Sequence, residues 1–262
     1  MPILQKTNLS FIAHSVTENP NQESFYKHSH NDYELFFFIR GDAEYVLENR
    51  CFTLKPYTLL FIKPAVYHYL RLKTLSPYER FIVNFSPKIV PAEVLARLEN
   101  NSPLYRFNKN SEVSRMFLSA ERKYRYYRSE DYSYLMELKL REIILSISYS
   151  GDYAEDGDLI EEDDTLNRII NFINGNLNRN LSLDTLSQEL FLSKSHISHL
   201  FSDKMRIGII KYIREKQLLY AQKLIRDGCL PTEVYKECGF EYYSSFYRAY
   251  LSYHGINPAR DR

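Results

Sequence analysis

The chain has 262 residues, an apolar content of 44% and a net charge of +1, values typical of globular proteins rather than of disordered, collagen-like or membrane-embedded chains. No segment is apolar over the length that a signal peptide or a membrane helix needs, and three cysteines without short paired spacings give no disulfide framework or cysteine metal site. We therefore expect a cytoplasmic protein of two domains with no membrane partner.

Residues 1–90 show the pattern of an all-β domain. Between residues 25 and 86, stretches of aromatic and β-branched residues alternate with short clusters of turn-forming residues. The candidate strands are Tyr33–Ile39, Ala43–Leu47, Leu59–Ile62, Tyr67–Leu72 and Arg80–Phe85. Their spacing predicts a β-barrel or a β-sandwich.

A group of histidines with one acid lies in the same region. His28, His30, Glu34 and Gly41 follow the pattern H-x-H-x3-E-x6-G, and His68 comes after a later turn. Residues i and i+2 of an extended segment point to the same side, so the first two imidazoles face one way. Over about residues 8–88 the pattern resembles the cupin barrel. Three histidines and a carboxylate suit a divalent metal ion.

The second part of the cupin pattern is incomplete, because Lys63 and Ala65 stand where proline and glycine are usual. We therefore expect neither a bound metal nor another cofactor, and we interpret the barrel as a pocket for a small molecule. The candidate ligand-binding residues are His28, His30, Glu34, Phe36, Tyr45 and His68. The alternative is a metal-dependent cupin enzyme in which His28, His30, Glu34 and His68 hold the metal.

Residues 91–150 change to a helical period. Within Glu112–Arg128, apolar residues recur at steps of three and four, and a second stripe follows up to Ile147. The stripes consist of Val113, Met116, Phe117, Ala120 and Tyr124, and then of Leu135, Leu138, Ile143, Ile144 and Ile147. The pattern predicts a helical hairpin. Such a hairpin either packs on its own barrel or joins a second subunit, and we assign 91–150 as the segment that pairs two chains into a homodimer.

Residues 151–164 have the composition of a connector. Eight of these fourteen residues are acidic, two are glycine and none is basic, as in a solvated linker. The remaining residues, 165–262, carry 14 Lys and Arg against 9 Asp and Glu. We therefore place a domain boundary in 151–164, ahead of a basic C-terminal domain.

Residues 165–262 contain an internal repeat of two helix-turn-helix units. An offset of 48 aligns Leu186, Leu190, Phe191 and Leu192 with Val234, Cys238, Gly239 and Phe240. An offset of 49 aligns Ile197, Leu200 and Phe201 with Phe246, Ala249 and Tyr250. Ser182, Ser193 and Thr232 are the expected helix starts. Between the units, Ile209–Arg226 is a continuous helical pattern with Ile210, Ile213, Leu218, Ala221, Leu224 and Ile225 as apolar positions.

The second helix of each unit carries polar residues on its predicted outward face. Eighteen helical residues between the units span roughly 27 Å, close to the ~34 Å of one DNA turn, so the two faces fit successive major grooves. The candidate DNA-binding residues are Lys194, Ser195, His196, Ser198 and His199 in the first unit and Tyr243, Ser244, Ser245, Tyr247 and Arg248 in the second. An arginine is the best candidate among them for a bidentate contact to guanine.

Residues 165–262 resemble the DNA-binding domain of the AraC-type family of bacterial transcription regulators. The resemblance rests on Ser182–Phe201, Cys238–Phe240, Ser245–Arg248, Gly255, Pro258 and Arg262. It implies two-site promoter binding, with RNA polymerase as a further partner, and usually activation of the adjacent operon. Phe191 and Arg206 depart from the family pattern, which has glycine at both positions, and Gln217 replaces an arginine.

The predicted fold class is α+β multidomain, with a cupin-like N-terminal β-barrel that carries a helical hairpin and an all-α double helix-turn-helix C-terminal domain. The predicted function is a DNA-binding transcription regulator, an activator rather than an enzyme. Its partners are promoter DNA and a small-molecule effector, for example a sugar, because barrel mouths are common ligand sites and aromatic faces suit sugars. A regulator whose barrel has lost its ligand is a third interpretation.

Overall fold

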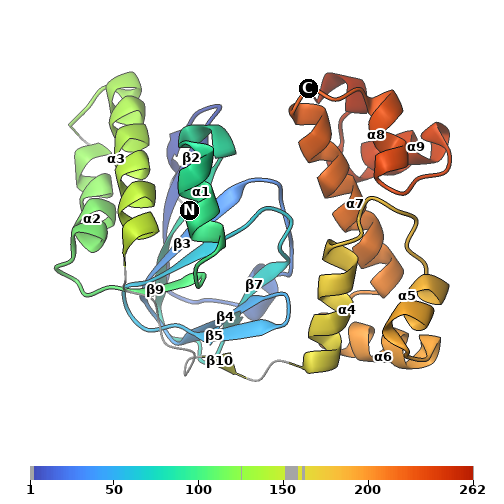
Figure 1. Ribbon diagram of the computed structural model, residues 1–262. Helices are drawn as coiled ribbons and strands as arrows, with labels where there is room; N and C mark the ends of the chain where they lie inside the picture. Colours follow the sequence, from blue (N-terminus) through green and yellow to red (C-terminus); the bar gives the residue numbers. More distant parts are fainter. Residues whose placement is uncertain (1–2, 125, 151–158, 161–162, 262) are drawn as a thin grey trace. The chain divides into compact units, whose positions relative to one another are not determined.

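The computed structural model describes residues 3–124, 126–150, 159–160 and 163–261 and is shown in Figure 1. The chain divides into two compact units, residues 1–160 and 161–262. The first unit is built on β-sheets and the second is helical, so the predicted fold class is confirmed.

The described residues of the N-terminal unit form two antiparallel sheets and three α-helices. In spatial order, the six-stranded sheet comprises β1 (Ile3–Lys6), β2 (Ser10–Thr17), β8 (Tyr78–Phe85), β3 (Tyr33–Arg40), β6 (Thr58–Ile62) and β9 (Leu104–Arg106). The four-stranded sheet comprises β10 (Leu159–Ile160), β5 (Arg50–Thr53), β4 (Ala43–Leu47) and β7 (His68–Leu72). Short 3-10 turns lie at η1 (Gln22–Ser24) and η2 (Pro87–Ile89).

Strand β3 separates the two cores of this unit. Leu35 and Phe37 belong to the core between the six-stranded sheet and the helices, whereas Phe36 and Phe38 belong to the core between the two sheets. Successive side chains of a strand point to opposite faces, so a run of aromatic and aliphatic residues is buried on both sides. Glu34, with the same parity as Phe36, therefore faces the space between the sheets.

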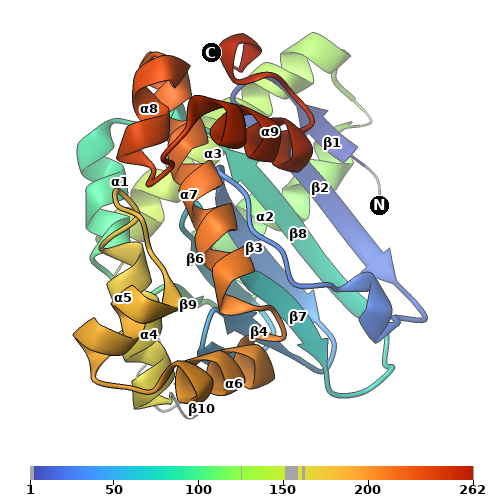
Figure 2. The same cartoon turned by 90° about the vertical axis from the view of Figure 1, so that its right-hand side faces the viewer.

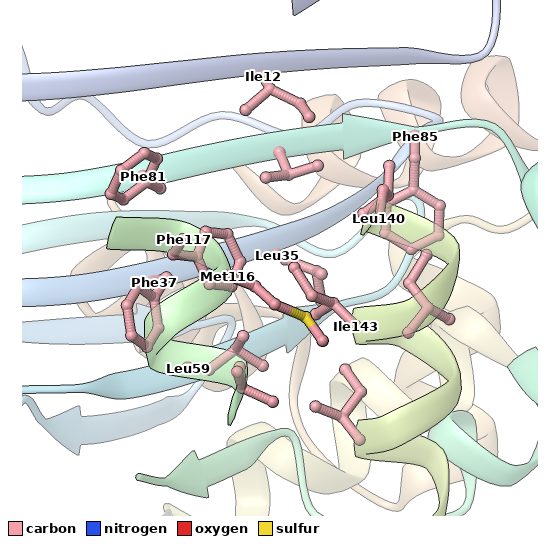
Figure 3. Close-up of a cluster of buried hydrophobic side chains, with 14 of the residues drawn as sticks. Ile12, Leu35, Phe37, Leu59, Phe81, Phe85, Met116, Phe117, Leu140 and Ile143 are labelled. Carbon is pink, nitrogen blue, oxygen red and sulfur yellow. The ribbon is translucent and has the colours of Figure 1, made fainter. Parts of the chain in front are cut away.

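The helices α1 (Ala92–Glu99), α2 (Glu112–Tyr124) and α3 (Ser129–Tyr149) cover one face of the six-stranded sheet (Figures 1 and 2). Figure 3 shows Met116 and Phe117 of α2 and Ile143 of α3 packed against Leu35 and Phe37 of β3. Phe117 stacks on Phe37 with ring centroids 4.5 Å apart. Most of each predicted apolar stripe therefore packs on the sheet of its own subunit.

Two details of the predicted hairpin segment differ in the structure. Leu138 does not join the core, because 46% of its surface is exposed. Residues Leu104–Arg106 form strand β9 beside β6, so 91–150 is not wholly helical. Three residues are too few to show an alternating pattern, and pairing with β6 determines their conformation.

The segment predicted as a solvated linker also contains structure. Leu159 pairs with Phe52 and Ile160 with Cys51, which makes β10 an edge strand of the smaller sheet. At the other end, the Asp163 carboxylate accepts hydrogen bonds from the backbone N–H groups of residues 165 and 166 and caps the next helix. Residues 151–158 and 161–162 lie outside the described residues.

The C-terminal unit is helical, as predicted. Its elements are α4 (Asp164–Asn174), α5 (Leu183–Leu190), α6 (Lys194–Met205), α7 (Ile209–Arg226), α8 (Pro231–Glu237), α9 (Tyr243–His254) and the 3-10 turn η4 (Pro258–Arg260). Ser182 Oγ and Ser193 Oγ accept the expected cap hydrogen bonds, from Thr185 N at 3.1 Å and His196 N at 3.2 Å. Helix α7 has the predicted bounds and runs from the α4–α6 group to the α8–α9 group (Figure 1).

The internal repeat is present in the backbone as well as in the sequence. Phe191 and Gly239, at an offset of 48, both adopt left-handed conformations, with φ of 55° and 72°. Arg206 and Gly255, at an offset of 49, end α6 and α9 in the same way, with φ of 55° and 69°. The first helix-turn-helix unit therefore has two left-handed turns without glycine, whereas the second helix-turn-helix unit has a glycine at each.

Replacing Phe191 with glycine is expected to raise the free energy of unfolding of the C-terminal unit by about 0.5–1 kcal/mol. The phenylalanine side chain is 90% exposed, so it contributes little burial, while its β-carbon strains the left-handed turn. Urea unfolding of the full chain measures the change. Phe191→Ala is the control, because it removes the ring but keeps the strain. A less stable glycine variant would mean that the ring makes a stabilising contact.

Candidate functional site

The outward face of α6 is polar and open to solvent. Lys194, Ser195, His196 and His199 are exposed and Ser198 is half-buried. The opposite face, with Ile197, Phe201 and Met205, is fully buried. The predicted residues of the first unit therefore share one accessible surface. Lys194 forms a surface ion pair with Asp184 of α5, a kind of contact that binds weakly and yields readily to another anion.

The outward face of α9 agrees with the prediction only in part. Ser244, Ser245 and Arg248 are exposed, and Arg248 Nε donates to the Ser244 carbonyl oxygen at 3.3 Å. The other two predicted residues are half-buried: Tyr243 packs on the core of the second unit, and Tyr247 Oη accepts a hydrogen bond from Asn257 at 3.2 Å. A tyrosine has an apolar ring and a polar tip, so helical spacing alone did not separate surface positions from core positions.

The two helix-turn-helix units are connected by a closely packed contact. Gln217 of α7, at the position where the family has arginine, donates from Nε2 to the Arg179 carbonyl oxygen at 3.0 Å. A side chain at Gly239 would collide with this carbonyl and with the Gln217 amide, so only glycine fits there. Ile210, one of the apolar positions of the predicted helical pattern, is 47% exposed and does not join the core.

A buried aspartate that the sequence analysis missed fastens the end of the chain. Asp261 Oδ2 accepts hydrogen bonds from Gln222 Nε2 at 2.6 Å and Tyr250 Oη at 2.8 Å, and Oδ1 accepts from Arg226 Nε at 3.0 Å. These partners lie on α7 and α9, so the carboxylate ties both helices to η4. No local motif marks the residue, since its partners are distant in sequence.

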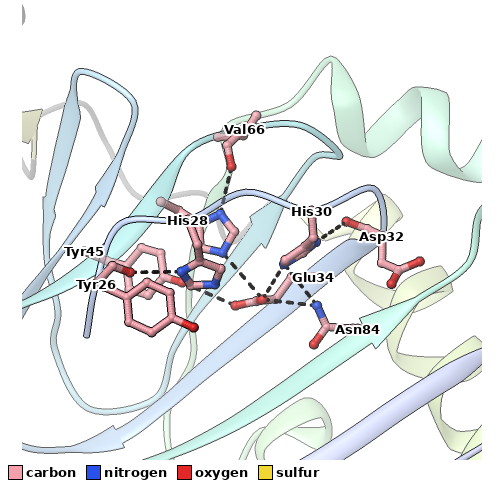
Figure 4. Close-up of polar contacts among 9 residues, drawn as sticks. Tyr26, His28, His30, Asp32, Glu34, Tyr45, Val66 and Asn84 are labelled. Carbon is pink, nitrogen blue, oxygen red and sulfur yellow. Dashed lines mark hydrogen bonds and ion pairs between the residues drawn. The ribbon is translucent and has the colours of Figure 1, made fainter. Parts of the chain in front are cut away.

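The polar residues predicted in the N-terminal barrel meet in space, as Figure 4 shows. One ring nitrogen from each of His28, His30 and His68 lies within 4.8 Å of the others. Glu34 Oε2 lies 3.1 Å from His30 Nε2 and 3.7 Å from His68 Nε2. Asn84, on β8, adds a hydrogen bond of 3.3 Å to the same carboxylate. The sequence spacing predicted this meeting, with the exception of Asn84.

Backbone carbonyls orient the three imidazoles. The Nδ1 atoms of His28, His30 and His68 lie 3.0, 3.0 and 2.8 Å from the carbonyl oxygens of Tyr26, Asp32 and Val66. A carbonyl oxygen only accepts, so each Nδ1 carries a proton. A neutral His28 or His68 ring then offers a lone pair at Nε2, whereas His30 Nε2 donates to the Glu34 carboxylate at 3.1 Å and would have to lose that proton to bind a metal ion. A carbonyl acceptor at Nδ1 is the arrangement by which proteins orient histidine ligands of metals.

The charges of the barrel cluster follow from burial and hydrogen bonding. Burial alone would raise the pKa of Glu34, but the hydrogen bond to His30 and the neighbouring imidazoles lower it to about 2. Burial lowers the pKa of His68 to about 4. His68 Nε2 has no hydrogen-bond partner among the described residues. A neutral imidazole nitrogen thus faces an ionised carboxylate with no donor between them, and these four residues fit a divalent cation.

A cavity of about 180 Å³ lies beside this cluster, between the two sheets. His28, Glu34, Phe36 and Tyr45 line it, as predicted, and the Tyr45 hydroxyl donates to Glu34 Oε1 at 3.3 Å. His30 and His68 contact Glu34 but do not line the cavity. Further lining residues that the sequence analysis did not select are Ser24, Phe25, Tyr26, Tyr69, Leu70, Tyr78, Arg80 and Ile82.

Two family models together match most of the chain. The AraC-like ligand binding domain matches residues 13–138, and a helix-turn-helix domain matches residues 186–262. Among the described residues, no helix is long and apolar enough to cross a membrane.

The chain is similar to three known proteins. The probable transcriptional regulator LumQ of Photobacterium leiognathi is 34% identical over 35% of this chain and 38% of its own length. The uncharacterized HTH-type transcriptional regulator YfiF of Bacillus subtilis (strain 168) is 21% identical over 97% of this chain and 84% of its own length. The HTH-type transcriptional activator AarP of Providencia stuartii is 27% identical over 44% of this chain and 82% of its own length. The chain belongs to the AraC-type family of transcription regulators, with a ligand-binding domain followed by a helix-turn-helix DNA-binding domain.

Proposed function

We propose that the protein is a cytoplasmic transcription activator that binds promoter DNA through α6 and α9 and responds to a small molecule in its barrel. One observation carries the proposal: two helix-turn-helix units repeat in sequence and in backbone conformation, and each presents an exposed polar helix face. The 18 residues of α7 span roughly 27 Å, which suits two major-groove contacts about one helical turn apart.

Within these faces we assign the DNA contacts residue by residue. Lys194, Ser195, His196, Ser198 and His199 bind through α6, and Ser244, Ser245 and Arg248 bind through α9. Tyr243 and Tyr247 position α9, because both rings are held by neighbours in the same unit. Activation, through contact with RNA polymerase, is supported by the similarity to the activator AarP.

The effector site is the cavity between the two sheets. Its lining combines aromatic rings with a few polar groups, as is usual in sites for small metabolites such as sugars. We propose that this barrel senses its ligand rather than transforming it. A reporter fused to the promoters of neighbouring genes tests the function as a whole. Expression should fall when the gene is deleted and return with the full chain, and unchanged expression at every such promoter would contradict activation.

We further propose that α3 joins two chains into a homodimer. Tyr134, Leu138 and Leu145 are exposed, and spacings of four and seven residues place them on one face of the helix. This stripe is separate from the buried stripe of the same helix. Sedimentation of the double variant Leu138→Glu, Leu145→Glu tests the interface. We expect the original chain to be a dimer and the double variant to be a monomer. A variant that remains dimeric would exclude α3.

A second candidate function, binding of a divalent metal in the barrel, is favoured by one ring nitrogen from each of His28, His30 and His68, which lie within 4.8 Å of one another beside the ionised Glu34. The incomplete cupin motif predicted no metal, but that motif does not include the carbonyl groups that orient His28, His30 and His68. His28, His30, His68 and Glu34 would hold the ion. A bound ion would polarise a ligand oxygen in the adjacent cavity.

Metal binding predicts that Zn²⁺ or Ni²⁺, added to the chelator-treated full chain, raises its melting temperature. His68→Ala is expected to weaken the ion by roughly tenfold or more, because it removes a ligand atom. His199→Ala, which changes an exposed histidine of the other unit, is the control. Elemental analysis of the purified protein gives the resident metal. An absent shift, or an equal shift in the His68 variant, would rule out this site.

A further inference from the structure

One wall of the barrel cavity carries a positive charge. Tyr78 and Arg80 lie two residues apart on β8, so both side chains are on the same face of the strand, and both line the cavity. Tyr78 Oη and Arg80 Nη1 are both shielded from solvent, and apart from the interaction of these two side chains with each other neither atom has a hydrogen-bond partner among the described residues. Two hydrogen-bonding groups are therefore available to a ligand at this wall.

Aromatic rings hold the guanidinium group in place. Arg80 Cζ lies 4.9 Å from the centre of the Tyr78 ring and 5.3 Å from the centre of the Phe25 ring. The two rings meet edge to face, with centroids 5.6 Å apart. A guanidinium group held over aromatic rings by cation–π contacts can still donate its N–H groups in hydrogen bonds. These N–H groups match the two oxygens of a carboxylate or a phosphate.

No carboxylate among the described residues forms an ion pair with this arginine. Glu34 is the only acid among the described residues that line the cavity, and its oxygens already contact His30 at 3.1 Å, Asn84 at 3.3 Å and Tyr45 at 3.3 Å. Arg80 is half-buried and has no ion-pair partner, and its shielded Nη1 lacks an acceptor, so an anion that enters the cavity gains this interaction. Glu34 and His28 offer acceptors for hydroxyl groups on the other side.

We propose that the effector is a small polyhydroxylated organic anion of the sugar-acid class. Its acidic group binds Arg80 and Tyr78, and its hydroxyl groups bind Glu34 and His28. This inference rests on the proposed role of the barrel as effector site and names the chemistry of its ligand. The volume of about 180 Å³ is slightly larger than the roughly 150 Å³ that accommodates benzene in an engineered protein cavity. It therefore suits a single ring or a short chain.

The test compares matched acidic and neutral compounds on the full chain by titration calorimetry. Galacturonate and gluconate are paired with galactose and glucose, and galactose 6-phosphate replaces the carboxylate with a phosphate. The acids should bind at least tenfold more tightly than their neutral partners. Arg80→Gln should weaken the acids by about 10- to 100-fold, the usual range for a hydrogen bond to a charged group, and leave the neutral sugars unchanged. Arg40→Gln, on β3 outside the cavity, is the control.

Each outcome decides the proposal. Preference for galactose 6-phosphate over galacturonate supports it and assigns phosphate as the acidic group. If Arg80→Gln fails to fold, Arg80→Lys, which keeps the charge but loses the planar fork, should weaken the acids by several-fold. Equal binding of neutral sugars, an unchanged preference in the Arg80 variants, or no binding of any acid at 10 mM would overturn the inference. DNA binding, measured on the same samples, tells this failure from a failure of the proposed function.

Discussion

Replacing Asp261 with asparagine is expected to lower the free energy of unfolding of the C-terminal unit by about 2–3 kcal/mol. The buried carboxylate accepts hydrogen bonds from Gln222, Arg226 and Tyr250 at 2.6–3.0 Å. Asparagine keeps one oxygen but turns an N–H₂ group toward these donors. Because Arg226 is half-exposed, solvent screens part of the ionic contribution, and the expected loss is smaller than the roughly 3–5 kcal/mol of a fully buried ion pair.

The same carboxylate makes the C-terminal unit sensitive to acid. Burial alone would raise the pKa of Asp261, but the hydrogen bonds from Gln222, Tyr250 and Arg226 lower it. A lowered carboxylate pKa stabilises the folded state above the ordinary aspartate range, and this contribution is lost as the pH falls through the folded-state pKa. Asp261→Asn should therefore remove that part of the acid sensitivity.

Urea unfolding of the full chain at neutral and acidic pH measures both effects. Asp203→Asn, which changes an exposed aspartate of α6, serves as the control and should alter stability little. An Asp261→Asn variant within about 0.5 kcal/mol of the original protein, the scatter of ordinary surface substitutions, would show that the network does not fasten η4.

Replacing Arg248 with alanine is expected to weaken promoter binding by about 1–3 kcal/mol and to relax base preference at one or two positions. Arg248 is exposed on α9, and its intrahelical bond to the Ser244 carbonyl leaves its other nitrogens able to reach a base edge. A phosphate contact would instead weaken all sequences alike. Mobility-shift titrations against the promoter and against scrambled DNA separate the two cases.

For the first helix-turn-helix unit we expect a change in the salt dependence of DNA binding. Lys194 begins α6 with a flexible ammonium group, so Lys194→Ala should reduce the slope of log affinity against log salt by about 1, the value for one phosphate contact. Lys88→Ala removes the same charge from an exposed position of the N-terminal unit and is the control. Equal effects of the two variants would mean that only overall charge matters.

Much of the C-terminal unit was predictable because its signals are local. The serine caps and the helical period lie within a few residues of the structure that they specify, and α7 begins and ends where the pattern does. The strands were harder. Strand β2 carries an irregular mixture of polar and apolar residues and is held by pairing with β8 from Ser10 to Thr17. Strand β10 consists of two apolar residues within an acidic segment, so its pairing with β5 could not be predicted from the local composition.

The barrel site was predictable only as far as its motif extends. The spacing of His28, His30 and Glu34 indicated one cluster, and the structure brings His68 to it. Arg80 was missed because nothing local in a strand distinguishes a cavity arginine from a surface arginine. Asp261 was missed because its partners are up to 39 residues away.

DNase footprinting of the full chain on the region upstream of neighbouring genes tests the central claim most directly. We expect two protected segments on one face of the duplex, with centres about 10–10.5 base pairs apart, one for each helix-turn-helix unit. Alanine at Lys194 and His199 should remove one segment, and alanine at Arg248 should weaken the other. No protection, or a footprint unchanged when all three residues are replaced, would contradict DNA recognition through α6 and α9.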